Sequence, residues 1–203
     1  MIQSRFEQAV AALSAVSAAD PNQEMVNGVS RPRELVQTER LVAWIARLSP
    51  EASEALRLAA FSQHVGRYRV PRSTYPEGRV GYLRWRTDLA KRHAATARAV
   101  LTQVGYDEAT IAAVERINLK RNLRLDADVQ TMEDALCLSF LEHELAPFAS
   151  EHEPEKTIAI LQKTWRKMSP RARELALTLE LPALARDLVA RALARGAESD
   201  SEG

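Results

Sequence analysis

The chain has 203 residues, with 28 Lys and Arg against 27 Asp and Glu and a single Cys. This length suits one domain with an adequate apolar core, and one Cys excludes a disulfide framework or a Cys-rich zinc site. A net charge of +1 argues against whole-surface attraction to nucleic acid or to an anionic membrane. The sequence shows no signal peptide and no apolar run of membrane-spanning length, so we expect a cytoplasmic protein with no membrane partner.

The predicted elements are almost entirely helices. The 33 Ala and 24 Leu residues exceed a quarter of the chain and favour helix, and no stretch shows the alternation typical of strands, so we expect no sheet. The expected helices cover residues 3–18, 34–48, 49–66, 82–104, 107–119 and 130–149, with further helices starting at Pro154, Pro170 and Pro182. The last of them is expected to end near Arg195.

These elements predict one all-α domain, a compact helical bundle over residues 1–195. Its C-terminal helices, residues 154–195, are expected to pack on the bundle as a further layer. Residues 196–203 are rich in Ser, Asp and Glu, which favours a disordered tail.

Residues 66–82 differ from the helical segments around them and predict a long Arg/Tyr-rich loop. They contain three of the seven Gly residues and three of the four Tyr residues, and a helix does not pass Pro71 and Pro76 undisturbed. Between Arg67 and Arg86 there are six arginines and one acid, Glu77, so the local charge is +5. Long structured loops are often functional.

Arginine grips phosphate and carboxylate in a planar, bidentate manner, and aromatic neighbours can stack on a base or on a guanidinium group. We therefore expect a small anionic ligand, phosphate- or carboxylate-bearing, on this loop. The alternative is that the arginines pair with surface acids while the tyrosines pin the loop to the core. Nucleic acid is less favoured, because no second basic patch extends the footprint. The expected ligand contacts are Gln63, Arg67, Arg69, Arg72, Tyr75, Arg84 and Arg86.

Four ionisable residues follow apolar positions at helical spacing and are expected to face the core: Glu39, His64, His93 and Asp134. A buried charge needs a partner or a metal. Imidazole and carboxylate are a suitable ligand set for Zn, Mn or Fe, so a divalent metal is one interpretation of these four residues. The alternative is that each is a hydrogen-bonded core residue. Cys137 lies in an apolar helix and is expected to be a buried hydrophobe.

Two stretches carry a family resemblance. The first runs from Ser53 to Tyr68 and continues through Val70-Pro71-Arg72 and Tyr75-Pro76 to Gly81-Tyr82-Leu83-Arg84-Trp85-Arg86. The second runs from Gln130 to Leu138 and continues with Phe140-Leu141-Glu142. They resemble the family catalogued as domain of unknown function 4202, over nearly the whole chain up to about Met168. This resemblance implies no particular activity.

A more distant resemblance is to HD-domain phosphohydrolases, whose Ala-Ala-x-x-His-Asp-x-Gly-Lys string is similar to residues 59–67. This resemblance implies an HD-like core at about residues 34–150, with the metal-binding pair at Gln63 and His64. It also places the earlier histidine near Glu39 and the later aspartate near Asp134. Glutamine replaces the motif histidine, and a neutral amide is a poor ligand for a transition metal. The resemblance therefore implies a mononuclear divalent-metal site held by Glu39, His64 and Asp134 in place of a binuclear one.

Three functions compete. The first is an HD-like hydrolase, a phosphohydrolase acting on a small phosphorylated or nucleotide-like anion. In it, His64, His93 and Asp134 are catalytic, and a divalent metal activates water. The second is a metal-free module that binds an anionic metabolite or nucleotide, favoured by the glutamine at position 63. The third is a protein or RNA interaction domain. The sequence allows a homodimer and does not define the substrate.

Overall fold

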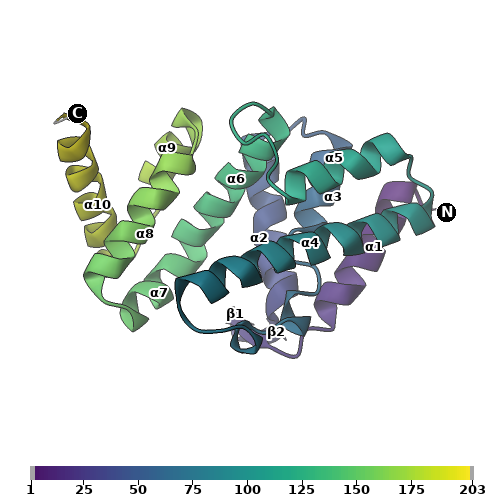
Figure 1. Cartoon of the computed structure of the whole chain (residues 1–203), viewed down its shortest axis with the longest axis horizontal. Helices are drawn as coiled ribbons and strands as arrows, with labels where there is room; N and C mark the ends of the chain where they lie inside the picture. Colours follow the sequence, from purple (N-terminus) through teal and green to yellow (C-terminus); the bar gives the residue numbers. More distant parts are fainter. Residues whose placement is uncertain (1–2, 202–203) are drawn as a thin grey trace. The chain divides into compact units, whose positions relative to one another are not determined.

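The structure is a computed structural model that describes the backbone of residues 3–201 and the side chains of residues 3–196. The chain divides into two compact units, Met1–Met132 and Glu133–Gly203, with the boundary inside helix α6, Ala127–Ser139. Both are built from helices, which confirms the predicted all-α class (Figure 1).

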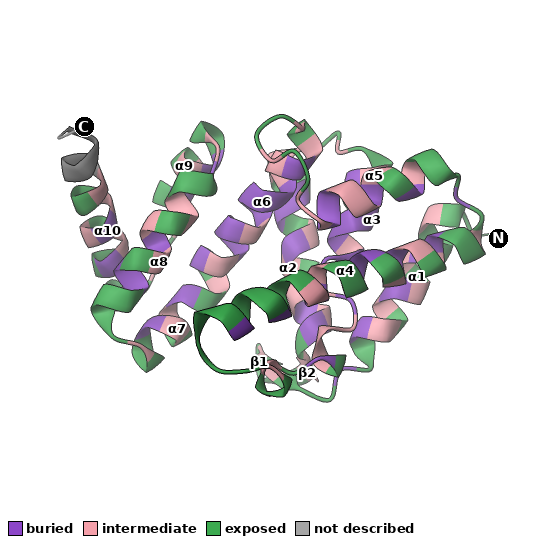
Figure 2. Cartoon of the chain, in the orientation of Figure 1, coloured by how far each residue is buried: buried purple, intermediate pink, exposed green. Residues whose placement is uncertain are grey.

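The first unit is organised around the short helix α3. It contains α1 (Arg5–Ala18), α2 (Arg33–Leu48), α3 (Glu54–Ser62), α4 (Gly78–Val104) and α5 (Glu108–Asn118). Helix α3 packs against each of the other four. Its residues Leu56 and Leu58 are fully buried, and the small side chains of Ala59 and Ala60 let the neighbouring helices approach closely. Figure 2 colours much of this helix as buried.

The ends of these helices follow their capping residues. Helix α3 begins after Ser53, whose hydroxyl accepts from the amide of Leu56, and not at Ser49 as predicted. Helix α4 begins at Gly78, four residues before the predicted start at Tyr82. Its predicted end is confirmed, because Gly105 adopts φ +87°, the left-handed conformation that closes a helix.

The prediction that the chain contains no sheet is wrong at one place. Strands β1 (Gln23–Val26) and β2 (Val29–Pro32) form an antiparallel hairpin in which Val26 pairs with Val29. Asn27 and Gly28 connect them with φ of 50° and 80°. Two central residues of positive φ are what a tight hairpin turn requires, and Asn-Gly supplies them with little strain.

The second unit starts within α6 and continues through a π-helical turn, Phe140–Glu144, and α7, Leu145–Glu151. Pro147 has no amide hydrogen to continue the α-helical pattern, and the wider turn just before α7 accommodates it. Helices α8 (Pro154–Lys167) and α9 (Pro170–Leu177) begin at prolines as predicted, and α10 (Ala183–Ser201) follows Pro182. Cys137 is buried in α6, as expected.

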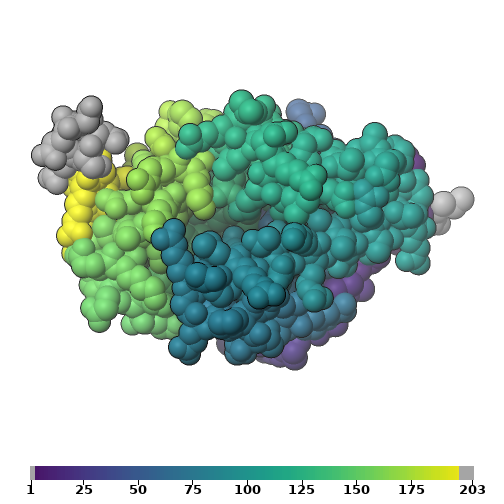
Figure 3. Space-filling model, viewed as in Figure 1, coloured from purple at the N-terminus to yellow at the C-terminus, as the bar shows by residue number. Residues whose placement is uncertain are grey.

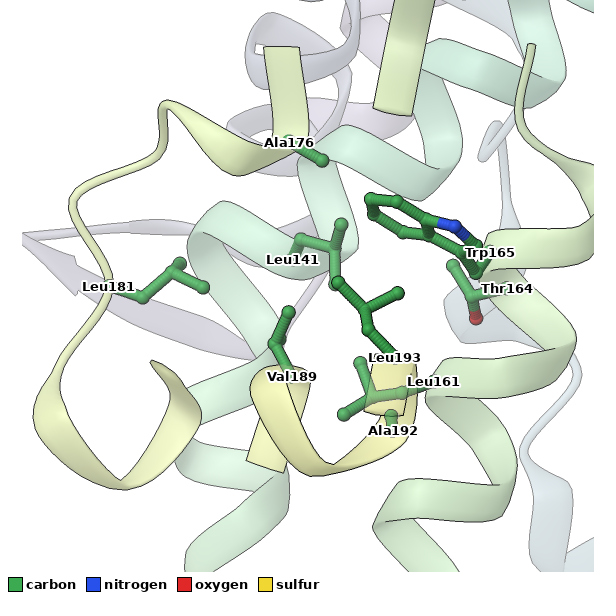
Figure 4. Close-up of a pocket in the computed structure, with 9 residues that line it drawn as sticks. All are labelled: Leu141, Leu161, Thr164, Trp165, Ala176, Leu181, Val189, Ala192 and Leu193. Atoms are coloured by element: carbon green, nitrogen blue, oxygen red, sulfur yellow. The ribbon is translucent and has the colours of Figure 1, made fainter. Parts of the chain in front are cut away.

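The second unit has a small apolar gap in its interior (Figure 4). Its volume of about 10 Å³ has room for roughly one water molecule, so it is a packing defect of the core and not a ligand site. The lining side chains come from the π-helical turn, α8, α9, α10 and the segment before α10: Leu141, Leu161, Thr164, Trp165, Ala176, Leu181, Val189, Ala192 and Leu193.

Helix α10 continues to Ser201, so the backbone of residues 196–201 is helical where the sequence predicts a disordered tail. Ala197 and Glu198 are good helix formers, and Gly196 alone does not stop a helix. Residues 202–203 and the side chains of the tail lie outside the described residues.

Candidate anion-binding site

The predicted loop is a pair of single 3₁₀ turns, Arg67–Arg69 (η1) and Arg72–Thr74 (η2), placed between α3 and α4. The carboxylate of Glu34, on α2, anchors the first turn. It accepts hydrogen bonds from the amides of Gly66 (2.6 Å) and Tyr68 (3.4 Å) and from the hydroxyl of Ser17 (3.0 Å). Burial raises the pKa of Glu34, and the two amide donors oppose that shift.

The second turn is held by Arg72. Its guanidinium donates to the carbonyls of Tyr75 (2.9 Å), Pro76 (2.8 Å) and Gly78 (3.4 Å). Arg72 was predicted to contact the ligand, but these bonds engage both of its terminal nitrogens with the backbone of its own loop. Its role in this structure is therefore to shape the loop.

A small apolar cluster of Val70, Trp85 and Leu89, with Tyr75 packed against it, joins the loop to α4. The indole of Trp85 donates to the carbonyl of Val70 over 2.9 Å. The backbone also approaches α4 very closely, because a Cβ added at Gly81 would lie 1.9 Å from the carbonyl oxygen of Pro76. Only glycine fits there, and this close contact fixes where the loop meets the helix.

A pocket of about 470 Å³ opens between the loop and α4. This volume is in the range of small-molecule sites. Three guanidinium groups and one carboxylate are among its lining residues, which are Arg69, Val70, Thr74, Tyr75, Pro76, Arg84, Asp88 and Arg92. The loop and the first half of α4 form the blue surface at the lower centre of Figure 3.

The pocket wall on α4 follows from helical spacing. Arg84, Asp88 and Arg92 are four residues apart, so they line one face of the helix. Asp88 accepts from the hydroxyl of Tyr75 over 3.0 Å. In the part of the chain that the structure describes, neither Arg84 nor Arg92 forms a salt bridge, so both cations face the pocket without a protein carboxylate bound to them.

The structure brings only some of the predicted ligand contacts to the pocket. Arg69, Tyr75 and Arg84 line the pocket together. Arg67 lies over the ring of Trp85, with its guanidinium carbon 5.1 Å from the ring centre. The sequence analysis did not select Arg92. Its spacing of eight residues from Arg84 could have placed both arginines on one face of the helix.

His64 lies just after the end of α3, and His93 contacts the backbone of the next residue, Val65. His93, on α4, is 5% exposed, and its Nδ1 lies 2.9 Å from the carbonyl oxygen of Val65. Burial lowers the pKa of His93 to about 4, and nearby Arg67 and Arg86 contribute to that shift. Burial, followed by the charge of Arg67, also lowers the pKa of His64 well below its ordinary value. Both shifts favour the neutral form of the imidazole.

The residues predicted as carboxylate ligands of a metal have other partners. Glu39 was expected to face the core, but its side chain is 49% exposed and forms a bidentate ion pair with Arg31, at 2.7 and 2.9 Å. Asp134, in the second unit, accepts from the amide of Ser169 over 2.8 Å at the start of α9. Among the described residues, no group of three or more His, Cys, Asp or Glu side chains is arranged to hold a metal ion. The proposed ligand set of Glu39, His64 and Asp134 stays a prediction.

The fold and the site define an all-α protein with an arginine-lined pocket between a structured loop and a long helix. A family model described as "Domain of unknown function (DUF4202)" matches residues 7–189, and the chain belongs to this family. No curated protein and no solved structure matches the sequence. The distant similarity to HD-domain phosphohydrolases is not confirmed by these comparisons. No helix among the described residues is long and apolar enough to cross a membrane.

Proposed function

We propose that this protein binds a small phosphate- or carboxylate-bearing metabolite in the pocket between the Arg/Tyr loop and α4. The observation that carries this proposal is the convergence of Arg69, Arg84 and Arg92 on one pocket in which Asp88 is the single acid. Guanidinium groups bind such anions through paired N–H donors, and three of them exceed what one carboxylate neutralises. No metal is required for this binding mode.

The loop is built to present these groups in a fixed arrangement. Glu34 anchors η1, Arg72 closes η2 on itself, and the contact at Gly81 sets the loop against α4. A site that is ordered before the ligand arrives loses less entropy on binding. The hydroxyl of Tyr75 and the carboxylate of Asp88 form a hydrogen-bonded pair, and this pair can accept a hydrogen bond from a donor on the ligand.

The proposal is tested by thermal-shift and calorimetric titration with inorganic phosphate, pyrophosphate and citrate. We expect at least one of these anions to raise the melting temperature saturably, because a ligand of the folded state stabilises it by mass action. Arg84→Ala and Arg92→Ala should each weaken that binding at least tenfold. Arg79→Ala is the matched control, since Arg79 is exposed on the same helix and does not line the pocket. Unchanged affinity in both pocket variants would refute the proposal.

Hydrolysis of a phosphorylated ligand is the second candidate function. The observation that favours it is that His93 Nδ1 lies 2.9 Å from the carbonyl oxygen of Val65, which brings this buried imidazole beside the segment that carries His64. A neutral imidazole can take a proton from an attacking water, while arginines offset the charge that develops on the phosphoryl group.

This candidate is tested by release of inorganic phosphate from a panel of nucleotides and sugar phosphates. Elemental analysis of the untagged protein and of His64→Ala would accompany the assay. We expect His64→Ala to abolish the activity with little loss of helicity, and any metal bound through His64 to disappear in that variant. Full activity in His64→Ala would refute the assignment of this residue.

A further inference from the structure

The charged side chains that α4 contributes to the pocket alternate in sign along the helix. Arg84, Asp88 and Arg92 follow one another at intervals of four residues and all line the pocket. Because an α-helix rises about 1.5 Å per residue, the backbone positions of the two arginines lie about 12 Å apart, with Asp88 midway between them. The wall of the pocket therefore presents a cation, an acid and a second cation in succession.

Opposite charges four residues apart on a helix usually pair with each other, and here they do not. In the part of the chain that the structure describes, neither Arg84 nor Arg92 forms an ion pair with Asp88. The Oδ2 atom of Asp88 accepts instead from the hydroxyl of Tyr75, on the loop, over 3.0 Å. The two guanidinium groups and the Oδ1 atom of Asp88 are thus left available to a ligand in the pocket.

Asp88 is the strongest hydrogen-bond acceptor that the pocket offers. The backbone carbonyls of three other lining residues, Val70, Tyr75 and Pro76, already accept from nearby side chains. A charged carboxylate is also a stronger acceptor than a carbonyl. The donor on the ligand is a neutral hydroxyl and not an ammonium group, because the three arginines of the pocket outnumber its one carboxylate and repel a cation.

We propose that the pocket selects a ligand in which two anionic groups flank a segment that bears hydroxyl groups. One anionic group binds Arg84, the other binds Arg92, and a hydroxyl between them donates to Asp88. Arg69, from the loop, adds a third cation, and the volume of about 470 Å³ has room for such a ligand. This inference rests on the function proposed above, since it concerns the same pocket, and it defines the charge pattern of the ligand.

The shared chemistry has two sources, a sugar bisphosphate or a hydroxylated dicarboxylate, and two sets of probes distinguish them in calorimetric titrations. The phosphate set is fructose 1,6-bisphosphate, fructose 6-phosphate, which has one anionic group, and hexane-1,6-diol bisphosphate, which has no hydroxyl. The carboxylate set is galactarate, gluconate, which has one carboxylate, and adipate, which has no hydroxyl. We expect the first compound of one set to bind at least tenfold more tightly than the other two compounds of that set.

Variants of α4 test the role of each charge. Arg92→Ala should reduce the affinity for the two-ended compound to that for its one-ended counterpart. Asp88→Ala should remove the advantage of the hydroxylated compound and tighten the binding of the compound without hydroxyls, because a like charge has left the pocket. Lys91→Ala is the matched control, since Lys91 is exposed beside Arg92 and does not line the pocket, and it should keep every affinity within twofold.

The outcomes separate this inference from the function proposed above. Equal affinity of the wild type for one-ended and two-ended compounds would overturn the inference alone, as would binding of inorganic phosphate with none of the six probes. Loss of all binding in Asp88→Ala would also overturn it, because Asp88 would then act by holding the loop through Tyr75. If phosphate, pyrophosphate, citrate and all six probes fail to bind the wild type, the proposed function is refuted as well.

Discussion

Arg72, on the loop, and Arg84, on α4, illustrate how two nearby arginines can have different roles. The guanidinium of Arg72 closes the loop on three carbonyls, whereas that of Arg84 faces the pocket. We expect Arg72→Ala to lower the free energy of unfolding by about 1–2 kcal/mol, since carbonyls of the loop lose a charged donor. Arg84→Ala should leave stability nearly unchanged and affect binding. Urea unfolding of both variants separates the roles, and equal stability of the two would contradict the structural role of Arg72.

The buried His93 of α4 is expected to make the stability of the folded protein fall as the pH is lowered. The pKa of His93 is about 4 in the folded protein, below its ordinary value of 6.5, so the unfolded chain takes up the proton first as the pH falls. The contribution of neutral His93 to stability is therefore complete above pH 6.5 and is lost between pH 6.5 and about pH 4. The loss amounts to at most about 1.4 kcal/mol for each pH unit.

The measurement is urea unfolding at pH 7, 6 and 5 for the wild type and for His93→Leu. The variant lacks the titrating group, so its stability should fall less steeply with acid, even if it starts lower because its bond to Val65 is gone. Parallel pH dependence in the two proteins would show that His93 titrates normally in the fold.

At the scale of elements, the approach of the loop to α4 depends on a missing side chain. A Cβ at Gly81 would overlap the carbonyl of Pro76, which is backbone and cannot swing aside. Gly81→Ala should therefore displace the loop, lower the melting temperature and weaken anion binding, because Tyr75 and Pro76 line the pocket. Gly196→Ala, in α10, is the control, since a Cβ there meets nothing within 4 Å. Normal binding by Gly81→Ala would show that the close approach is dispensable.

The sequence predicts helices well where capping residues and prolines mark them, as at Pro154, Pro170 and Gly105. It fails where a short-range turn decides the structure. The hairpin at Asn27-Gly28 was missed because strands of four residues show no sustained alternation.

The candidate site could be predicted in part. The concentration of arginines and tyrosines in the sequence located the loop. It did not show toward which part of the protein each side chain points. In α2, periodicity of apolar residues placed Glu39 inward, whereas the buried polar residues of that helix are Glu34 and Thr38. Both side chains have hydrogen-bond partners, and these bonds offset the cost of burying a polar group.

For the whole molecule, a net charge of +1 conceals a strongly basic region within the first unit. Its pocket contains one carboxylate, Asp88, which Tyr75 already engages, so the pocket alone offers little to a divalent cation. We expect dialysis against a chelator to leave the affinity for inorganic phosphate unchanged. Loss of that affinity on chelation, with recovery on adding a divalent metal, would show that the anion binds through a metal.

The central claim, that an anion binds between the Arg/Tyr loop and α4, is tested most directly by nuclear magnetic resonance of the isotopically labelled protein titrated with pyrophosphate. The chain of 22.6 kDa is small enough for residue-resolved amide spectra. The account predicts saturable shifts concentrated in residues 69–76 and 84–92, and their absence in Arg92→Ala. Shifts confined to other parts of the chain, or no saturable shift with any of pyrophosphate, phosphate and citrate, would contradict it.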